Sequence, residues 1–416
     1  MIRGMLRVLV AMLLAGSWTW PPEARAGGPP EPVEGAVTIR VATFNLNDVR
    51  TDDLLDPMNP RLRRLAQTIQ RLRPNVILLT EIAYDMPGAP GVDDDAQPGQ
   101  NARRFAESFL AAAQAPGLRA LDMAAFMAPV NTGIPSGHDL DLNGKVVMEY
   151  PTPPPPRADG TRPPPSEEAR AYGNDCHGFG TFPGQYGMAL LVDRRLEIVA
   201  GGVRTFRLMP WDFVPGGLLP SRADGSPWFT AQAQREVRLS SKSHWDVPVR
   251  LPNGAEVHFL CSHPTPPVFD GPENRNGRRN HDEIRFWADY IENASYIVDD
   301  QNNPGGLDKR AHFVILGDLN ADPEKGDSFK NPIATALFTS RRLHADQPPT
   351  SDLEIQGLSP SDTALFKLRV DYVLPSRTLG IVRSGVWRHA PVDPLTGRPA
   401  PFPSDHFPVW MEIMVP

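Results

Sequence analysis

The segment Phe313–Asp322 contains the residues whose types and spacing are best suited to chemistry. Its apolar run Phe313–Leu316 is typical of a buried strand, and it is followed by Gly317 and then by Asp318, Asn320 and Asp322. Carboxylate and amide oxygens on alternate residues are the ligands that a hard cation such as Mg²⁺ or Ca²⁺ prefers. The spacing therefore predicts a metal site at the end of a core strand.

Two other interpretations of this segment compete with a metal site. An EF-hand calcium loop also begins Asp-x-Asn-x-Asp, but it needs Gly where the chain has Pro323 and Glu where it has Phe329, so it is excluded. Asp318 and Asn320 can also cap a turn after the strand by bonding their own backbone. The segment alone leaves this second alternative open.

Further polar residues lie on or at the ends of other predicted core strands. A buried carboxylate without a partner costs free energy, so carboxylates in such places usually have a cation, an arginine or a histidine beside them. A single metal site would explain several of them together. These residues are Asn45, Asn47, Glu81, His263, Asp371, Asp405 and His406.

In their order along the chain, these residues resemble the endonuclease/exonuclease/phosphatase family, whose fold is that of deoxyribonuclease I. Each motif alone is common, but six of them occur in the family's order and at predicted strand positions. The chain departs from many relatives at Thr80 and Leu319, neither of which is a reacting group. The motifs are Phe44-Asn45, Thr80-Glu81, Ser262-His263, Gly317-Asp318-Leu319-Asn320, Val370-Asp371-Tyr372 and Ser404-Asp405-His406.

The resemblance implies a fold and a reaction. The fold is an α/β protein, a four-layer α/β/β/α sandwich of two mixed sheets flanked by helices. The reaction is hydrolysis of a phosphoester that depends on Mg²⁺, or on Mn²⁺ or Ca²⁺, by in-line attack of water. The expected partner is a phosphoester substrate: a nucleic acid, a lipid headgroup or a small organic phosphate.

The resemblance also implies roles for individual residues. Glu81 binds the metal, and Asn45 and Asp405 complete its oxygen shell. Asp318 orients or deprotonates the attacking water, and Asn320 donates to a phosphoryl oxygen. Asp371 fixes the tautomer of His406, which contacts the scissile phosphate, and His263 is the proposed acid for the leaving oxygen. Which of the two histidines acts as the acid stays open.

Substrate contacts are expected from residues beside these motifs. The segments Ser241–Asp246 and Asp270–Arg279 resemble a secreted bacterial branch of the family. The arginines could instead be solvated loop charges. His263, which is followed by a proline, could instead have a structural role. The expected contacts are Asn47, Lys242, His244, Arg275, Arg278 and Arg279.

Apolar patterns, helix-capping residues and turn residues in the sequence predict the elements that position the site residues. Asn59 and Pro60 start a helix that ends at Leu72, and strands over 37–47 and 76–80 flank it. A second helix is expected near 102–114, and Asn280 with Glu283 resembles the capping box of a third. Asn253-Gly254 predicts a hairpin. The remaining predicted strands are 187–192, its partner within 196–206, 245–251, 255–262, 366–374, 380–387 and 409–414.

The ends and the composition of the chain predict its organisation. Arg3, Arg7 and an apolar run before Ala24-Arg25-Ala26 are typical of a signal peptide over residues 1–26, which is too short and interrupted to span a bilayer. A flexible leader over 27–36 and one domain over 37–416 follow, with a Pro/Gly-rich insertion at about 131–184. No later segment is long and apolar enough to span a membrane. We expect a secreted or periplasmic monomer.

Charge and cysteine content bear on the alternatives. The 416 residues carry a net charge of −7, which becomes −9 without residues 1–26, and such a balance disfavours a general polyanion-binding surface. Cys176 and Cys261 could form a disulfide in this compartment or remain free thiols. The first expectation is a phosphodiesterase or nuclease. A lipid phosphodiesterase, a small-molecule phosphatase and a non-catalytic binding member of the fold are the alternatives.

Overall fold

Two mixed sheets of six strands form the centre of the protein, which we describe from a computed structural model covering residues 35–157, 161–393 and 396–416. The first sheet has the strand order β11-β12-β1-β2-β4-β3. Only β1 and β2 pair in parallel in this sheet, as expected for two strands joined by a helix. Its strands are β1 (Val37–Val49), β2 (Val76–Ile82), β3 (Met123–Phe126), β4 (Met188–Asp193), β11 (Gly380–Val386) and β12 (Val409–Val415).

The second sheet has the order β10-β9-β8-β7-β5, and β6 pairs with β7. Strands β7 and β8 form the antiparallel hairpin predicted by Asn253-Gly254, and β8 pairs with β9 in parallel across a helical connection. Its strands are β5 (Glu197–Ile198), β6 (Arg204–Thr205), β7 (His244–Arg250), β8 (Glu256–Ser262), β9 (His312–Asp318) and β10 (Asp371–Pro375).

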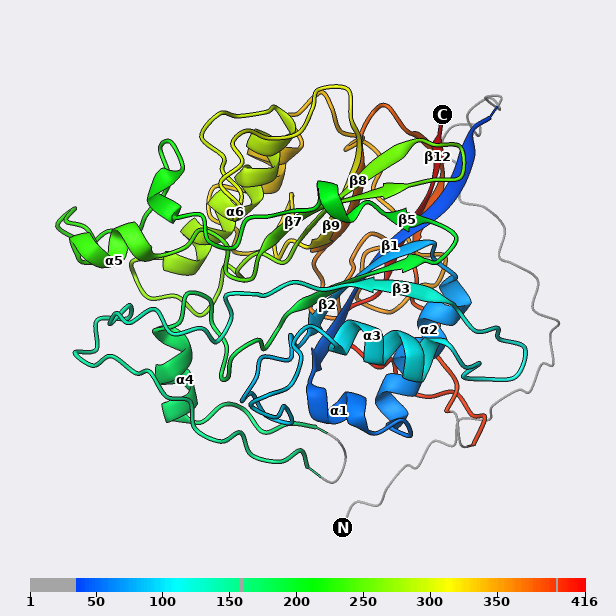
Figure 1. The fold of residues 1–416 in the computed structure, drawn as a ribbon, viewed down its shortest axis with the longest axis horizontal. Helices are drawn as coiled ribbons and strands as arrows, with labels where there is room; N and C mark the ends of the chain where they lie inside the picture. The colour runs from blue at the N-terminus through cyan, green and yellow to red at the C-terminus, as the bar shows by residue number, and fades with distance from the viewer. Residues whose placement is uncertain (1–34, 158–160, 394–395) are drawn as a thin grey trace, which may run out of the picture.

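Helices cover the outer faces of the two sheets, as Figure 1 shows, with α1, α2 and α3 below the first sheet and α6 above the second. Shorter helices α4 and α5 lie at one end of the molecule. The helices are α1 (Thr51–Leu55), α2 (Pro60–Leu72), α3 (Asn101–Phe105) continued by a π-helical turn (Ala106–Leu110), α4 (Glu167–Asn174), α5 (Ala231–Glu236), α6 (Arg275–Ile291) and a second π-helical turn (Ile333–Leu337).

Three apolar clusters fill the spaces between these layers. One lies between the sheets and includes Val41, Leu190 and Phe259. A second packs α6 on the second sheet, and a third packs α2 and α3 on the first. The predicted four-layer α/β/β/α sandwich is therefore confirmed.

Most of the predicted elements are present. Asn59 caps α2 by accepting hydrogen bonds from the backbone nitrogens of Arg61 and Leu62, with Pro60 at the first helical position. The predicted strands that begin at Val37, Val76, Gly380 and Val409 start at those residues.

Four predictions about elements were wrong. The 196–206 segment pairs with β7 rather than with the 187–192 strand, since β5 and β6 both bond to β7. The strand predicted from Phe366 begins only at Asp371, because the preceding residues form a turn that reaches the Asp405 backbone. Helix α6 begins at Arg275, so Asn280 and Glu283 lie inside it and form no capping box. The helix expected over 102–114 turns π-helical at Ala106 and ends at Leu110.

The 131–184 segment is closed at its base by its own backbone. Gly133 donates to the carbonyl of Gly178, and Gly184 donates to the carbonyl of Thr132. The segment contains α4 and otherwise forms turns and loops. Both cysteines are buried free thiols, which decides between the two alternatives left open by the sequence.

The predicted signal peptide and most of the leader lie outside the described residues, so they stay predictions. Within the part of the chain that the structure describes, no helix has the length and apolar character needed to cross a membrane.

Candidate active site

The predicted site residues meet where the ends of four strands from the two sheets come together. Asn45 on β1 lies between two carboxylates: its Nδ2 donates to Glu81 Oε1 at 3.2 Å and to Asp318 Oδ2 at 3.0 Å. Glu81 belongs to β2 in the same sheet, whereas Asp318 ends β9 in the other. Asp371, which begins β10, pairs directly with Asp318. One amide therefore ties the two sheets together at the site.

Around these strand ends the backbone adopts left-handed conformations, which residues other than glycine rarely adopt. Glu81, Asn47 and Asn320 have φ values of 59°, 56° and 53°. Such left-handed residues are concentrated at functional sites, where surrounding contacts hold them. Here the carboxylates supply those contacts: Glu81 Oε2 accepts from the Asp48 nitrogen at 2.9 Å, and Asp318 Oδ1 accepts from the Asn320 nitrogen at 2.9 Å.

Two histidines complete the cluster around Asp318. His406 Nδ1 lies 2.9 Å from Asp371 Oδ2, and its Nε2 lies 3.9 Å from Asp318 Oδ2. His263 Nε2 lies 3.5 Å from the same Asp318 oxygen. Bonding at Nδ1 orients the His406 ring and leaves Nε2 facing the centre of the site. The predicted pairing of His406 with Asp371 is present in the structure.

Charge interactions in this cluster separate the two histidines. Burial disfavours protonated His406, but the charges of Asp371 and Asp318 outweigh burial and raise its pKa to about 10. Burial lowers the pKa of His263 to about 4, and the charge of Lys242 acts in the same direction. At neutral pH His406 is therefore the cationic histidine and His263 the neutral one.

The carboxylates respond to the same environment. Burial raises the pKa of Glu81 to about 7, although the charge of His406 opposes this shift. Burial alone would raise the pKa of Asp318, but the charge of His406 and the hydrogen bond with His263 hold it below its usual range. Burial also raises the pKa of Asp371, to about 6, so Glu81 and Asp371 are both stabilised less than Asp318.

This donor set fits a divalent cation. Glu81 and Asp318 present several oxygens in one place, and their protein donors do not neutralise both. Asp318, Asp371 and His406 also bring ligand atoms within 4.8 Å of one another. Since His406 Nδ1 is bonded to Asp371, we interpret that trio as a histidine–carboxylate pair beside Asp318 rather than as the ligand set.

The other predicted members of the site lie at its edge. Asp405 is half-buried beside His406, where its charge helps to raise the His406 pKa. Asn320 donates its side-chain Nδ2 to the carbonyl of Pro264 at 3.1 Å. Asn47 is exposed, and its backbone nitrogen donates to Asn45 Oδ1.

Of the two residues predicted from the Ser241–Asp246 segment, one faces the site. The Lys242 ammonium is buried, donates to the carbonyl of Pro264 at 3.3 Å, and lies within electrostatic range of Glu81 and Asp318. His244 lies behind it, between Ser240 Oγ at 2.6 Å and the carbonyl of Glu283 at 2.9 Å. These two contacts occupy both ring nitrogens of His244.

The three predicted arginines of α6 have structural contacts. Arg275 donates to the carbonyls of Leu140 and Asn174, and Arg279 donates to those of Arg238 and Leu239. Arg278 donates to the Glu273 carbonyl and lies over the ring of Phe329. None of them is bonded to the carboxylates of the cluster in the described structure, and their contact with substrate stays a prediction.

Two residues of α6 support the site in a way that the sequence did not predict. Buried Glu283 accepts from the backbone nitrogens of Ser241 and Thr265, each at 2.6 Å, and so holds the segments that carry Lys242 and His263. Asn280 donates to the carbonyls of Thr265 and Leu319. The signal available in the sequence was an amide and an acid three residues apart, on the same side of the helix as its apolar residues.

A second acidic group lies in the 131–184 segment and was also missed. Asp139, Asp141 and Asp175 bring carboxylate oxygens within 4.8 Å of one another, and Asp139–Gly144 matches the first six positions of an EF-hand loop. Asp175 accepts from two backbone nitrogens. Because both carboxylate oxygens of Asp175 already accept backbone hydrogen bonds, we assign no ion to the group.

Several solved structures are similar to this chain. They include an endonuclease/exonuclease/phosphatase from Beutenbergia cavernae (19% identity, TM-score 0.48, covering 91% of this chain and 72% of that one). Human nocturnin (13%, 0.44, 90% and 94%) and a mannosyl-6-phosphatase from Bacteroides thetaiotaomicron (13%, 0.40, 90% and 99%) are others. With TM-scores below 0.5, they add no argument about function. Comparison with curated proteins finds no match.

The sequence model of one protein family matches the chain over nearly its whole described length. The match covers residues 42–406 and therefore includes every strand-end residue of the cluster, from Asn45 to His406. The model is that of the endonuclease/exonuclease/phosphatase family. The chain belongs to this family.

Proposed function

We propose that this protein is a divalent-metal-dependent phosphodiesterase that cleaves nucleic-acid strands. Its family consists of phosphoester hydrolases that depend on divalent metals. The observation that carries the proposal is the convergence on Asp318 Oδ2 of Asn45 at 3.0 Å, His263 at 3.5 Å and His406 at 3.9 Å. A carboxylate, a cationic histidine and a metal-binding acid in one place suit phosphoester hydrolysis.

Glu81 would hold the metal ion, with Asn45 and Asp405 beside it. When bound, such an ion neutralises charge on the phosphoryl oxygens. Titration of the protein with Mg²⁺, Mn²⁺ and Ca²⁺ would identify the ion that it binds.

The protein's own groups supply the remaining functions. Asp318, kept ionised by its neighbours, accepts a hydrogen bond from the attacking water and orients it. Cationic His406, oriented by Asp371, donates from Nε2 to a phosphoryl oxygen and stabilises the developing charge. Because His263 is neutral at neutral pH, His406 is also the better proton donor for the leaving oxygen.

A lipid phosphodiesterase is the second candidate. Three large apolar side chains of the 131–184 segment are exposed: Val146 at 49%, Met148 at 53% and Phe179 at 42%. Exposed apolar groups of this kind favour contact with a lipid surface. They are separated along the chain, however, and the described contacts do not join them into one patch.

We also propose that the protein acts outside the cytoplasm. The basic start, apolar run and Ala24-Arg25-Ala26 site of the sequence support export with cleavage after Ala26. Mass spectrometry of the protein recovered from culture medium or periplasm tests this: a mature chain beginning at Gly27 is expected, and an intact Met1 would contradict it.

A comparison of substrates tests the proposed activity. Wild type and His406→Ala are assayed with Mg²⁺ and with EDTA on bis-p-nitrophenyl phosphate, p-nitrophenyl phosphate, plasmid DNA and sphingomyelin. We expect metal-dependent cleavage of the diesters and of DNA, reduced in the variant by about 10² to 10⁴-fold. Faster turnover of sphingomyelin would favour the lipid candidate. No turnover by either protein would favour a non-catalytic member of the family.

A further inference from the structure

Two arginine side chains meet at one amide oxygen on the edge of the 131–184 segment. Arg238 Nη1 donates to Asn131 Oδ1 at 2.6 Å, and Arg207 Nη1 reaches the same oxygen at 3.5 Å. The two guanidinium nitrogens therefore lie within about 6 Å of each other. Like charges held this close repel each other, and an anion between them would offset this repulsion.

The guanidinium of a third arginine lies against the backbone of Arg238. Arg279 donates to the carbonyls of Arg238 and Leu239, at 2.6 and 2.8 Å. Burial lowers the pKa of Arg238 to about 10, and the charge of Arg207 contributes to this shift. Burial also lowers the pKa of Arg279 to about 10, and Arg275 and Arg238 contribute. The protein thus concentrates positive charge here at a cost in stability.

Carboxylates near the three arginines are engaged elsewhere. Asp300 affects Arg238 electrostatically, but its oxygens accept hydrogen bonds from Thr205 Oγ1 and from the backbone nitrogens of Arg207 and Leu208. Glu283, which affects Arg279, holds the Ser241 and Thr265 backbone. Among the residues that the structure describes, Arg207, Arg238 and Arg279 form no ion pair.

A buried imidazole provides an independent indication of a ligand. His177 is only 7% exposed, and its Nδ1 has no hydrogen-bond partner among the described residues. After burial, the contributions that lower its pKa come from Arg238, Arg279, Arg207 and His138. The backbone nitrogen of the next residue, Gly178, donates to the carbonyl of Asn131, so His177 lies beside the residue that holds Arg207 and Arg238. A buried polar nitrogen without a partner beside such guanidiniums is the arrangement that a bound anion would complete.

This basic cluster adjoins the active site through a short stretch of chain. Asn131 donates from its backbone nitrogen to the carbonyl of Lys242 and from Nδ2 to the carbonyl of Ser240. Lys242 in turn reaches the carbonyl of Pro264, the residue after His263. The Cα atoms of Arg238 and Lys242 are four residues apart, so they lie at most about 14 Å from each other.

We propose that Arg207, Arg238 and Arg279, together with His177, form a second anion site that binds a non-scissile phosphate of a polynucleotide strand. The inference rests on the proposed function and specifies its substrate. Guanidiniums pair well with phosphate oxygens, and the chain from Arg238 to Lys242 is short enough for one strand to reach both sites. A lipid diester with a single phosphate, such as sphingomyelin, could not occupy both sites.

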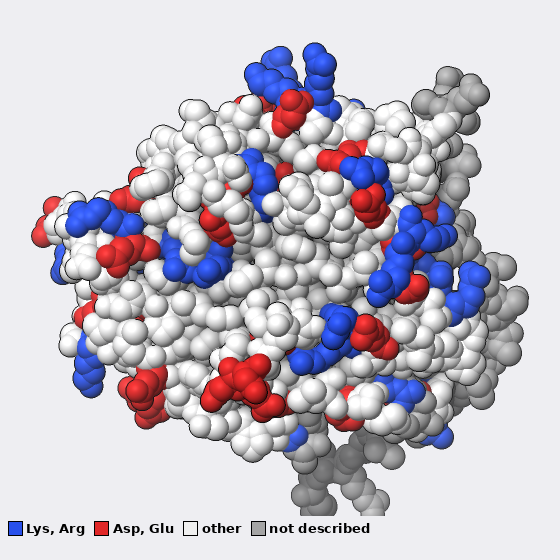
Figure 2. All heavy atoms as spheres, in the orientation of Figure 1, with Lys and Arg blue, Asp and Glu red and all other residues white. Residues whose placement is uncertain are grey.

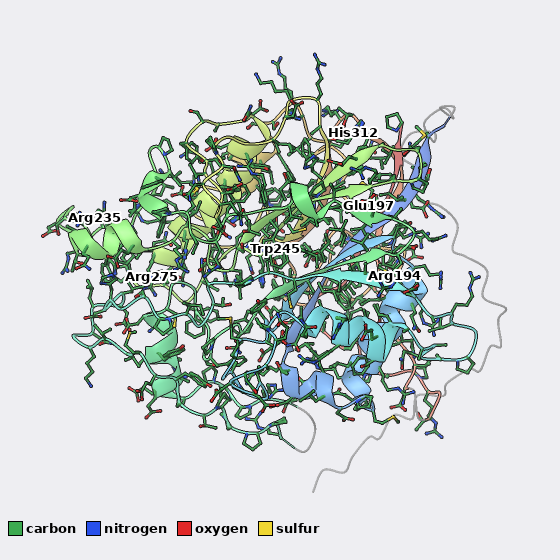
Figure 3. All side chains as sticks on the ribbon, viewed as in Figure 1. Arg194, Glu197, Arg235, Trp245, Arg275 and His312 are labelled. Atoms are coloured by element: carbon green, nitrogen blue, oxygen red, sulfur yellow. The ribbon has the colours of Figure 1, made fainter. Side chains whose placement is uncertain are left out.

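The surface of the molecule is consistent with an accessible site. Arg207 and Arg238 are partly exposed, whereas Arg279 and His177 are buried behind them. In Figure 2 a group of Lys and Arg side chains reaches the surface left of the centre, in the region where Figure 3 labels Arg275. Because Arg207 and Arg238 are partly exposed, a strand could reach them from solvent.

Two substrates that differ only in the number of phosphates test the second site. We compare a dinucleoside monophosphate, which has one phosphate, with a strand of about ten nucleotides. For Arg207→Gln/Arg238→Gln, we expect kcat/KM on the strand to fall at least about tenfold and the slope of log KM against log salt to change by about 1.4. Cleavage of the dinucleoside monophosphate should stay unchanged.

Two further variants separate this site from general effects. Arg222→Gln/Arg235→Gln removes the same charge from exposed arginines and should leave both substrates unaffected. Arg207→Lys/Arg238→Lys retains the charge and should recover most of the salt dependence, which shows that any loss is not a folding defect. Equal losses on the two substrates, or the same loss in the exposed pair, would overturn the proposal.

A binding measurement distinguishes failure of this inference from failure of the proposed function. Fluorescence anisotropy of the labelled strand is measured in EDTA, where no cleavage is expected. Weaker binding by Arg207→Gln/Arg238→Gln supports the second site even if no substrate is hydrolysed. Equal binding by that variant and wild type would overturn it.

Discussion

His406 Nδ1 lies 2.9 Å from Asp371 Oδ2, and this contact decides which histidine is charged at neutral pH. Burial opposes protonation of His406, but Asp371 and Asp318 raise its pKa to about 10. In Asp371→Asn the His406 pKa should fall toward its ordinary value of about 6.5. We expect kcat/KM to fall by at least about 100-fold at pH 8, and less at pH 6. The measurement is the pH profile of kcat/KM on bis-p-nitrophenyl phosphate.

The sign of this pH effect distinguishes it from a structural defect. A raised histidine pKa keeps the cation present as pH rises, so wild type should retain activity well above the pH at which the variant loses it. Asp224→Asn makes the same chemical change at an exposed turn and should leave the profile unchanged. An identical alkaline limb in wild type and Asp371→Asn would show that Asp371 does not control His406.

Glu81→Gln should separate metal binding from stability. Burial raises the pKa of Glu81 to about 7, so the folded protein binds this proton more tightly than the unfolded chain does. Without metal, the carboxylate therefore destabilises the fold increasingly as pH rises from about 4.5 to 7. In EDTA at pH 8 we expect the variant to be up to about 3 kcal/mol more stable than wild type. Added Mn²⁺ or Mg²⁺ should stabilise wild type only.

The test is thermal unfolding with EDTA and with increasing metal, at pH 5 and pH 8. The advantage of the variant should shrink at pH 5, where Glu81 is protonated in the folded protein. An equal shift of Tm with metal in the two proteins would place the ion elsewhere.

The layered fold and the strand-end cluster could be predicted from sequence because their signals are local. An apolar run such as Val76–Thr80 forms a buried strand, and the polar residue that ends it, Glu81, must lie at the mouth of the sheet. The same holds for Phe313–Asp318. The order of the motifs came from the family resemblance, and with it the sequence was enough to group Asn45, Asp318 and His406.

The contacts that depend on distant partners could not be predicted. His244 is two residues from Lys242, yet it faces Ser240 and the Glu283 carbonyl on α6 instead of the site. Arg207 and Arg238 meet only because both reach Asn131, a residue more than 70 positions earlier in the chain. No periodicity or motif in one segment contains that information.

His244 should make the protein sensitive to mild acid. Burial lowers the pKa of His244 to about 4, whereas in the unfolded chain it is about 6.5. The unfolded state therefore binds the proton more readily, and stability is lost as pH falls from about 6.5 to 4. The loss attributable to this residue is up to about 3 kcal/mol. His244→Asn should be less stable at pH 7 but should lose less stability on acidification.

The measurement is the free energy of unfolding in urea at several pH values for both proteins. Only the difference between their pH dependences is attributed to His244, because carboxylates titrate in both. Parallel curves between pH 7 and 4.5 would contradict the assignment.

Gly317 should be indispensable for the approach of β8 and β9 beside the site. A Cβ at this position would lie 1.9 Å from the carbonyl oxygen of Ser262, which is backbone and cannot move aside as a flexible side chain would. Gly317→Ala must therefore separate the strands that carry His263 and Asp318, at a cost of about 3 kcal/mol. Gly201→Ala is the matched control, since nothing lies within 4 Å of its Cβ position. Urea unfolding should show a lower midpoint for Gly317→Ala only, together with loss of diesterase activity; equal midpoints for the two variants would show that the strands adjust at little cost.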